Sequence, residues 1–172
     1  SFLHGSEIKF EKIISGLDKP WSLSFINQEN IILTEKSGNL FTLNLKDKKK
    51  SQIKHDLLFI LEDGQGGLLD VLFHEGEIYL SYSEYRGMRG YTSTSVAKGS
   101  FDKQNIKFKT IFRAEPPIDS GYHFGSRLVI KGNHLYITAG ERGQGMIAQD
   151  PSKHPGSIIR INLDGSIPKD NP

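Results

Sequence analysis

The sequence predicts an all-β protein made of repeated antiparallel sheets, and three observations carry this prediction. Short runs alternate apolar and polar residues with a period of two, as strands with one buried face do. Turns rich in Gly, Asn and Asp separate the runs, and glycine makes up 18 of the 172 residues, about 10% against a usual share of about 7%. Finally, one arrangement of strands and turns occurs three times, and no stretch shows sustained helical periodicity.

The spacing of this arrangement indicates the architecture. We expect strands at residues 22–26, 31–35 and 40–45 in the first copy, 69–73 and 78–83 in the second, and 127–130, 134–140 and 158–163 in the third. Phe25, Phe73 and Ile130 occupy equivalent positions and lie 48 and 57 residues apart. A repeat of about 40–50 residues built from antiparallel strands is typical of a β-propeller blade. We therefore predict a β-propeller of four-stranded antiparallel blades.

The length leaves this propeller incomplete. Propellers usually close with about 4–8 blades, whereas 172 residues hold about three blades of this size. Three blades have two open flanks, whose unpaired edges and apolar faces need a cover. Either a second chain closes the ring, or residues 1–172 are the N-terminal half of a longer protein; we favour the second alternative.

Composition excludes several classes of function. The 22 Lys and Arg residues against 20 Asp and Glu residues give a net charge of +2, too small an excess for a nucleic-acid-binding protein. No run approaches the roughly 18 apolar residues of a membrane span. The absence of cysteine excludes disulfides, thiolate metal sites and cysteine nucleophiles. The six histidines show no metal-ligand spacing, so we expect no histidine zinc site.

Three glycine-rich segments are candidates for a functional site. Gln65 lies in 63–70 (DGQGGLLD), His123 in 121–127 (GYHFGSR) and Glu141 in 139–145 (AGERGQG). The first two segments enter successive repeats at equivalent positions, so Gln65 and His123 should meet at one end of the central channel. A neutral His is a suitable general base near pH 7, and a carboxylate can orient its ring. Each segment also has a structural interpretation: a glycine-rich entry turn, a structural His, and an exposed Glu paired with Arg142.

Four motifs in order carry a resemblance to a known family. They are DKPWSL at 18–23, GQGGLLDV at 64–71, HFGSRLV at 123–129 and INLDGSIPKDNP at 161–172. With them the sequence resembles the PQQ-dependent soluble glucose dehydrogenases, the glucose/sorbosone dehydrogenase family, and within it the aldose sugar dehydrogenase branch. The similarity runs through essentially the whole chain. It implies a six-bladed propeller of which this chain forms three blades.

The resemblance also implies a reaction and roles for residues. In that family a His takes the proton of the sugar C1 hydroxyl while hydride passes from C1 to pyrroloquinoline quinone (PQQ), and Ca²⁺ polarises the quinone oxygens. By motif match His123 is the base and Glu141 its orienting carboxylate. Gln65, Tyr122 and Arg127 are expected to contact substrate or cofactor. Tyr122 replaces the Asp of the glucose dehydrogenase itself, which suggests a different and broader range of aldoses.

The parts of the site that hold the cofactor are expected outside this chain. The resemblance places the Ca²⁺ ligands and the cations that pair with PQQ carboxylates in the missing half, so we expect no metal site here and an inactive chain on its own. The implied partners are an aldose sugar and an external electron acceptor, and the implied location is periplasmic or secreted. The alternative is a non-catalytic propeller module that binds carbohydrate or protein, which would have no need of Gln65, His123 and Glu141 together.

Overall fold

The structure is a computed structural model that describes residues 8–87 and 89–171. Within these residues the chain forms 13 β-strands, one short 3-10 helix, η1 (Gly145–Gln149), and no α-helix. The all-β prediction is therefore confirmed. No helix in the described part of the chain has the length and hydropathy needed to cross a membrane.

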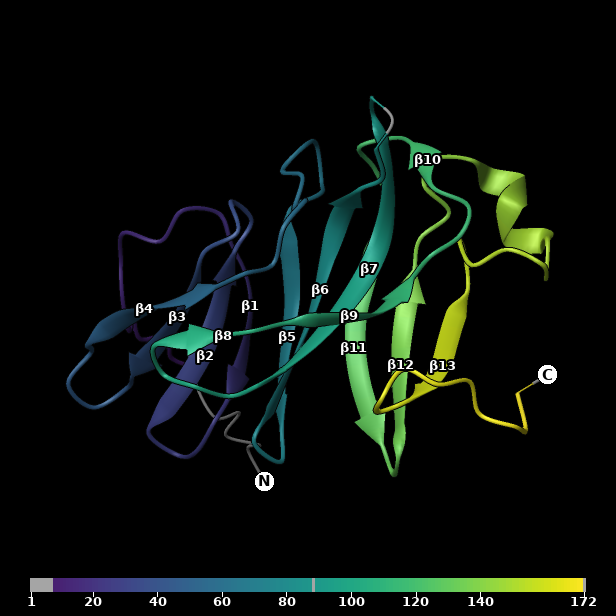
Figure 1. Cartoon of the computed structure of the whole chain (residues 1–172). Helices are drawn as coiled ribbons and strands as arrows, with labels where there is room; N and C mark the ends of the chain where they lie inside the picture. Colours follow the sequence, from purple (N-terminus) through teal and green to yellow (C-terminus); the bar gives the residue numbers. More distant parts are fainter. Residues whose placement is uncertain (1–7, 88, 172) are drawn as a thin grey trace, which may run out of the picture.

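The strands form three twisted sheets that lie side by side like the blades of a fan (Figure 1). In chain order they are β1 (Pro20–Phe25), β2 (Asn30–Glu35), β3 (Leu40–Asn44) and β4 (Lys50–His55) in blade 1, β5 (Leu68–His74), β6 (Glu77–Tyr85), β7 (Tyr91–Ser100) and β9 (Lys109–Arg113) in blade 2, and β11 (Gly125–Lys131), β12 (His134–Ala139) and β13 (Ile158–Asn162) in blade 3. Neighbours within each blade pair antiparallel. Two short strands are added: β8 (Asn105–Ile106) pairs parallel with β4, and β10 (Ile118–Asp119) pairs with β7. The predicted repeat is thus confirmed, with a third blade of three strands in the described residues.

Five strands were absent from the sequence prediction: the two-residue strands β8 and β10, and the longer β4, β7 and β9, whose composition explains the difference. Residues 92–95 of β7 are Thr, Ser, Thr and Ser, all buried, so the strand shows no apolar alternation. It forms because β6 and β9 supply partners on both sides. The outer strands β4 and β9 carry charged residues, and β4 buries only Ile53. Pairing with neighbouring strands, and not the local period, determines these elements.

The core lies between the blades because successive residues of a strand face opposite sides of its sheet. In β6, Ile78, Leu80 and Tyr82 pack toward blade 1, in a cluster with Ile32. Tyr79 packs the other way, against Leu135 of blade 3 and its neighbours. Blade 2 is consequently apolar on both faces, as an interior blade of a propeller should be.

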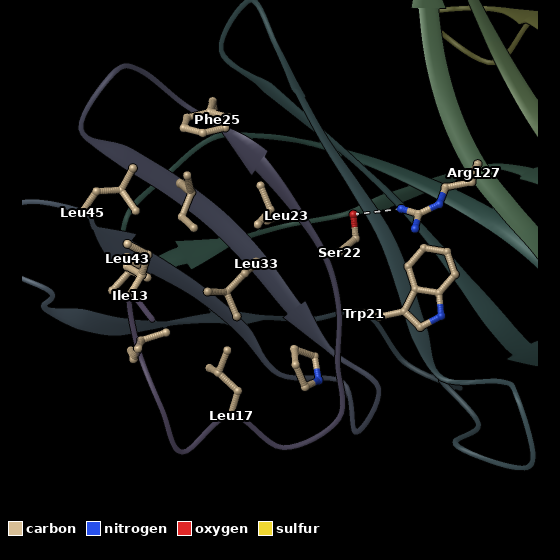
Figure 2. Close-up of a pocket in the computed structure, with 13 residues that line it drawn as sticks. Ile13, Leu17, Trp21, Ser22, Leu23, Phe25, Leu33, Leu43, Leu45 and Arg127 are labelled. Carbon is tan, nitrogen blue, oxygen red and sulfur yellow. Dashed lines mark hydrogen bonds between the residues drawn. The ribbon is translucent and has the colours of Figure 1, made fainter. Parts of the chain in front are cut away.

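The outer face of blade 1 remains partly uncovered. Residues 13–17 of the N-terminal segment contact it through Ile14 and Leu17, yet Leu23 and Phe25 of β1 are 54% and 60% exposed. Figure 2 shows the resulting apolar groove, about 620 Å³ in volume. On the opposite flank, Val129 and Ile158 of blade 3 are also exposed. Both flanks therefore present apolar side chains where further blades would pack in a ring.

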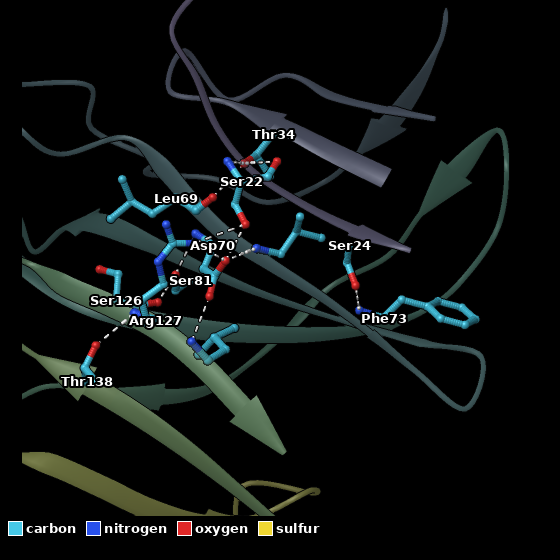
Figure 3. Close-up of polar contacts among 12 residues, drawn as sticks. Ser22, Ser24, Thr34, Leu69, Asp70, Phe73, Ser81, Ser126, Arg127 and Thr138 are labelled. Carbon is cyan, nitrogen blue, oxygen red and sulfur yellow. Dashed lines mark hydrogen bonds and ion pairs between the residues drawn. The ribbon is translucent and has the colours of Figure 1, made fainter. Parts of the chain in front are cut away.

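The innermost strands β1, β5 and β11 are joined by one buried carboxylate, that of Asp70 on β5 (Figure 3). Its Oδ2 accepts a hydrogen bond of 2.8 Å from the backbone N of Leu128 on β11. Its Oδ1 accepts from the Ser22 hydroxyl on β1, from Arg127 Nη1 at 3.1 Å and from the Val71 backbone N at 3.1 Å. A single side chain on β5 thus makes hydrogen bonds to the innermost strands of the other two blades.

Candidate functional site

The candidate residues come from three loops at one end of the inner strands. Gln65 precedes β5, His123 precedes β11, and Glu141 follows β12. The His123 backbone N donates to Gln65 Oε1 at 2.8 Å, and the Gln65 backbone N donates to the Gly121 carbonyl at 2.7 Å. The entry loops of blades 2 and 3 therefore bind each other, and the predicted meeting of Gln65 and His123 is confirmed as geometry.

The Glu141 carboxylate contacts the His123 ring. The imidazole Nδ1 and Glu141 Oε1 share a short hydrogen bond, and the Gly143 backbone N donates to the same oxygen at 3.1 Å. The hydrogen bond with His123, helped by nearby backbone N–H groups, lowers the pKa of the Glu141 carboxyl. The carboxylate fixes the proton on Nδ1. Nε2 has no protein partner among the residues described here, and the ring is 51% exposed, so Nε2 can accept a proton from a ligand.

Backbone geometry brings this pair together. His123 has a φ of +52°, a left-handed conformation unusual for a residue with a side chain. Its carbonyl lies against the α-carbon of Gly140, where an added Cβ would meet the carbonyl oxygen well inside the 3.0 Å limit of real contacts. The loop carrying His123 can approach the end of β12 only because residue 140 is glycine.

Substituting Gly140 by alanine should disturb the site and the fold together. The Cβ must displace the His123 carbonyl, so we expect a destabilisation of about 1–3 kcal/mol and loss of the His123–Glu141 hydrogen bond. Gly132→Ala is the control: Gly132, in the turn at the far end of the same hairpin, has a φ of +57° and nothing near its missing Cβ. It should cost about 1–2 kcal/mol from left-handed strain alone and leave the site intact.

The measurements are urea unfolding and the NMR resonance of the His123 Nδ1 proton, which reports its hydrogen bond with Glu141. Equal loss of this resonance in both variants would contradict the role given to Gly140.

A small cavity of about 240 Å³ lies beside the His123 ring, lined by Trp21, Gln65, Leu69, His123, Phe124 and Gly125. Trp21 and Phe124 were not among the predicted site residues. Trp21 belongs to the DKPWSL motif, whose only aromatic residue was the available signal. The cavity combines an amide, an imidazole and an indole, groups that bind and orient a polar molecule with a flat or apolar face.

The remaining predicted residues lie at the margin of this cavity. Tyr122 is 60% exposed, and its ring lies 6.3 Å from the His123 ring. Arg127 places its guanidinium 4.2 Å from the centre of the Trp21 ring and forms the ion pair with Asp70. Arg127 therefore lies next to the cavity, because it contacts the lining residue Trp21. Its ion pair with Asp70 also gives it a role in holding the blades together.

One alternative interpretation of the sequence is wrong. Glu141 does not pair with Arg142, because the Arg142 side chain turns to the opposite side of its loop and is 2% exposed. Its guanidinium binds the Tyr122 carbonyl at 2.8 Å, among other neutral acceptors.

Within residues 8–87 and 89–171, no three His, Asp or Glu side chains gather closely enough to bind a metal ion. The donor set at the cavity is Gln65, His123 and Trp21, with a carboxylate only behind the imidazole. This set suits an organic ligand better than a hard cation such as Ca²⁺, which prefers several oxygen ligands.

Fold and site together define a partial β-propeller with a histidine hydrogen-bonded to a carboxylate at one end of its inner strands. The chain matches the sequence model of the family described as Glucose / Sorbosone dehydrogenase over residues 17–172. It belongs to that family.

Individual relatives agree with this assignment. The aldose sugar dehydrogenase YliI of Escherichia coli strain K12 is 35% identical over 96% of this chain and 47% of its own length. A solved structure titled glucose dehydrogenase superposes with a TM-score of 0.87 and 34% identity over 94% of this chain and 53% of that one. The PQQ-bound aldose sugar dehydrogenase of Streptomyces coelicolor shares the fold, with a TM-score of 0.81 and 20% identity over 94% of this chain and 50% of its own. The chain spans about half the length of these proteins.

Proposed function

We propose that this chain is the N-terminal half of a PQQ- and Ca²⁺-dependent aldose sugar dehydrogenase, in which His123 is the general base. The observation that carries the proposal is the His123–Glu141 hydrogen bond beside a cavity shared with Gln65 and Trp21. The exposed apolar flanks of blades 1 and 3 favour a ring completed by further blades. The chain's coverage of about half of YliI agrees with this view.

His123 performs the proton transfer in this proposal. An aldose in its ring form becomes a lactone when it loses the C1 hydroxyl proton and the C1 hydrogen with two electrons. Nε2 of neutral His123 accepts the hydroxyl proton, while Nδ1–H remains hydrogen-bonded to Glu141, which stabilises the imidazolium that forms. The bound quinone supplies the two-electron acceptor for the C1 hydrogen.

The residues that line the cavity can contact an aldose and a quinone on one side. Gln65 Oε1 is engaged by the His123 backbone, which leaves its amide NH₂ to donate to a sugar hydroxyl or a quinone oxygen. Trp21 offers an aromatic face next to it. None of the lining residues is cationic, so we expect the carboxylates of PQQ and the Ca²⁺ ion to be held by the other half, and this chain alone to be inactive.

Tyr122 and Arg127 complete the proposed assignments. The exposed Tyr122 ring beside His123 would contact the sugar and favour a broad range of aldoses. Arg127 would contact substrate or cofactor from above Trp21. We further propose a periplasmic or secreted location and an external protein or small-molecule electron acceptor.

The test is turnover by the complete protein, meaning the full-length gene product that contains this chain. Purified without cofactor and then supplied with PQQ and Ca²⁺, it should oxidise aldoses and reduce an artificial acceptor, and omission of PQQ should abolish the reaction. Binding of PQQ without turnover of any aldose would contradict the proposal. Binding of sugar in the absence of PQQ, again without turnover, would instead favour a non-catalytic carbohydrate-binding propeller.

Glu141→Gln should lower kcat by at least about tenfold, though less than removal of His123, because a neutral amide cannot stabilise the imidazolium. Glu141→Asp is the control, since it keeps a carboxylate. Wild-type kcat in Glu141→Gln would contradict the orienting role.

The pH dependence of this pair has a definite sign. Because the pKa of Glu141 is lowered from 4.5 in the folded protein, the His123–Glu141 interaction is fully present above about pH 4.5 and is lost as the pH falls through the lower folded-state pKa. Activity that depends on this hydrogen bond should therefore be lost as the pH falls through the folded-state pKa of Glu141, because the protonated carboxyl no longer acts as a charged acceptor for the Nδ1 proton. A pH–rate profile of kcat/KM checks this. If the acid side of this profile shifts in Glu141→Asp by the difference between the pKa values of the two carboxyl groups, Glu141 itself controls the loss of activity.

A further inference from the structure

Arg142 is a buried cation that the proposed reaction does not use. Its Nε donates to the Tyr122 carbonyl at 2.8 Å, and Nη1 donates to the Thr92 carbonyl at 3.1 Å. Nη2 donates to the Thr92 hydroxyl at 2.7 Å and to the Ser120 carbonyl. The guanidinium carbon lies 3.7 Å from the centre of the Phe124 ring. All four hydrogen-bond acceptors are neutral, so the charge is buried against dipoles and an aromatic face.

Such an arrangement needs a reason, because burial of a charge without a counter-ion is costly. Burial lowers the pKa of Arg142 to about 10, so the side chain still carries its charge near neutral pH. Arg142 also adopts a left-handed φ of +58°. An apolar residue would fill this space at lower cost, which indicates that the hydrogen bonds themselves are required.

Three of the four residues that the guanidinium contacts belong to the loop that carries His123. The carbonyls of Ser120 and Tyr122 and the ring of Phe124 flank His123 on both sides in the sequence, and all three contact the same guanidinium. Thr92, the fourth partner residue, belongs to β7 of blade 2. Arg142 thus connects the His123 loop to β7 of the neighbouring blade.

Glu141, the residue before Arg142, contacts the same loop at the His123 ring. Glu141 holds the His123 ring through Nδ1, while Arg142 holds the backbone that carries the ring. The Gly140 contact with the His123 carbonyl fixes a third point. Three successive residues after β12 therefore determine where His123 lies and how its ring is turned.

We propose that Arg142 is a positioning residue for His123: its guanidinium holds the loop of residues 120–124 so that Nδ1 meets Glu141 and Nε2 faces the cavity. The inference deepens the proposed function and rests on it for the catalytic role of His123. It does not make Arg142 a catalytic residue, since the buried guanidinium does not line the cavity.

The test compares Arg142→Met with Arg113→Met in the complete protein. Arg113 forms two hydrogen bonds with the buried Glu84 on the far side of blade 2, at 2.7 and 2.9 Å, so its loss should destabilise the fold without touching the His123 loop. Two readouts are needed: kcat and KM of the protein supplied with PQQ and Ca²⁺, and the NMR resonance of the His123 Nδ1 proton in the protein without cofactor. His123→Gln assigns that resonance by its absence.

We expect Arg142→Met to lower kcat by about 10²-fold with a smaller change in KM, as displacement of a catalytic group by about 1 Å can do. The His123 proton resonance should broaden or disappear. Arg113→Met should keep both the resonance and kcat at an equal or larger loss of thermal stability. If Arg142→Met does not fold, Arg142→Lys, which keeps the charge but not the planar fork, should give the same changes to a lesser degree.

A sharp His123 resonance together with wild-type kcat in a folded Arg142 variant would overturn the inference. The inference would also be overturned if kcat fell in proportion to the loss of thermal stability in both Arg142→Met and Arg113→Met. The NMR readout separates this inference from the proposed function. If the wild-type protein oxidises no aldose, yet the resonance is lost in Arg142→Met and kept in Arg113→Met, the positioning of His123 stands and the proposed function fails.

Discussion

Replacing His123 by alanine in the complete protein should lower kcat by about 10²–10⁴-fold, the usual contribution of general acid–base catalysis. The substitution removes the only imidazole among the residues that line the cavity. KM for the aldose should change less, because Gln65 and Trp21 remain. Steady-state kinetics with PQQ, Ca²⁺ and an artificial acceptor measure both parameters.

The effect should be chemical and not structural. The His123 side chain is half exposed and lies on a loop, so its removal creates no cavity in the core. His134→Ala is the matched control, because His134 begins β12 at the opposite end of the same blade. It should retain full activity. Unchanged turnover in His123→Ala would exclude His123 as the base.

Replacing Asp70 by alanine should have the largest effect on stability. The substitution leaves the buried Leu128 N–H without an acceptor and the Arg127 guanidinium without its carboxylate. Loss of these hydrogen bonds from a buried carboxylate should cost about 3 kcal/mol. Because the donors come from β1 and β11, the loss should loosen all three blades at the channel.

Urea unfolding of the complete protein gives the change in the free energy of unfolding. Asp47→Ala is the control, because Asp47 is an exposed turn carboxylate that accepts only from the nearby Lys49 backbone N. It should change stability by less than about 0.5 kcal/mol. A similarly small change in Asp70→Ala would show that packing between the sheets, and not this carboxylate, fixes the blades.

The sequence was most informative where a repeated pattern could be aligned. Phe25, Phe73 and Ile130 defined the blades. The equivalent positions of the loops before β5 and β11 predicted that Gln65 and His123 would lie close together, as they do. The interior of β7 could not be predicted, because its Thr and Ser residues are buried between two paired strands and show no apolar alternation.

The contacts of Arg142 could likewise not be predicted, although Glu141 was expected beside His123. Glu141 and Arg142 are adjacent charges of opposite sign, a pattern that favours a simple ion pair. Arg142, whose backbone is left-handed, instead binds the Tyr122 carbonyl, while Glu141 binds the His123 ring. Trp21 entered the site for a similar reason: only the packing of blade 1 against blade 2 brings β1 beside the His123 loop.

The central claim is that His123, oriented by Glu141, accepts the proton when an aldose is oxidised. It is tested most directly by a single turnover without oxygen, in which the complete protein loaded with PQQ and Ca²⁺ is mixed rapidly with aldose and the oxidised-quinone absorbance is followed. We predict that this absorbance is lost in the wild type, and that His123→Ala, with PQQ bound, loses it about 10²–10⁴-fold more slowly. Loss at the wild-type rate in the variant, or persistence of the absorbance in the wild type at saturating aldose, would contradict the account.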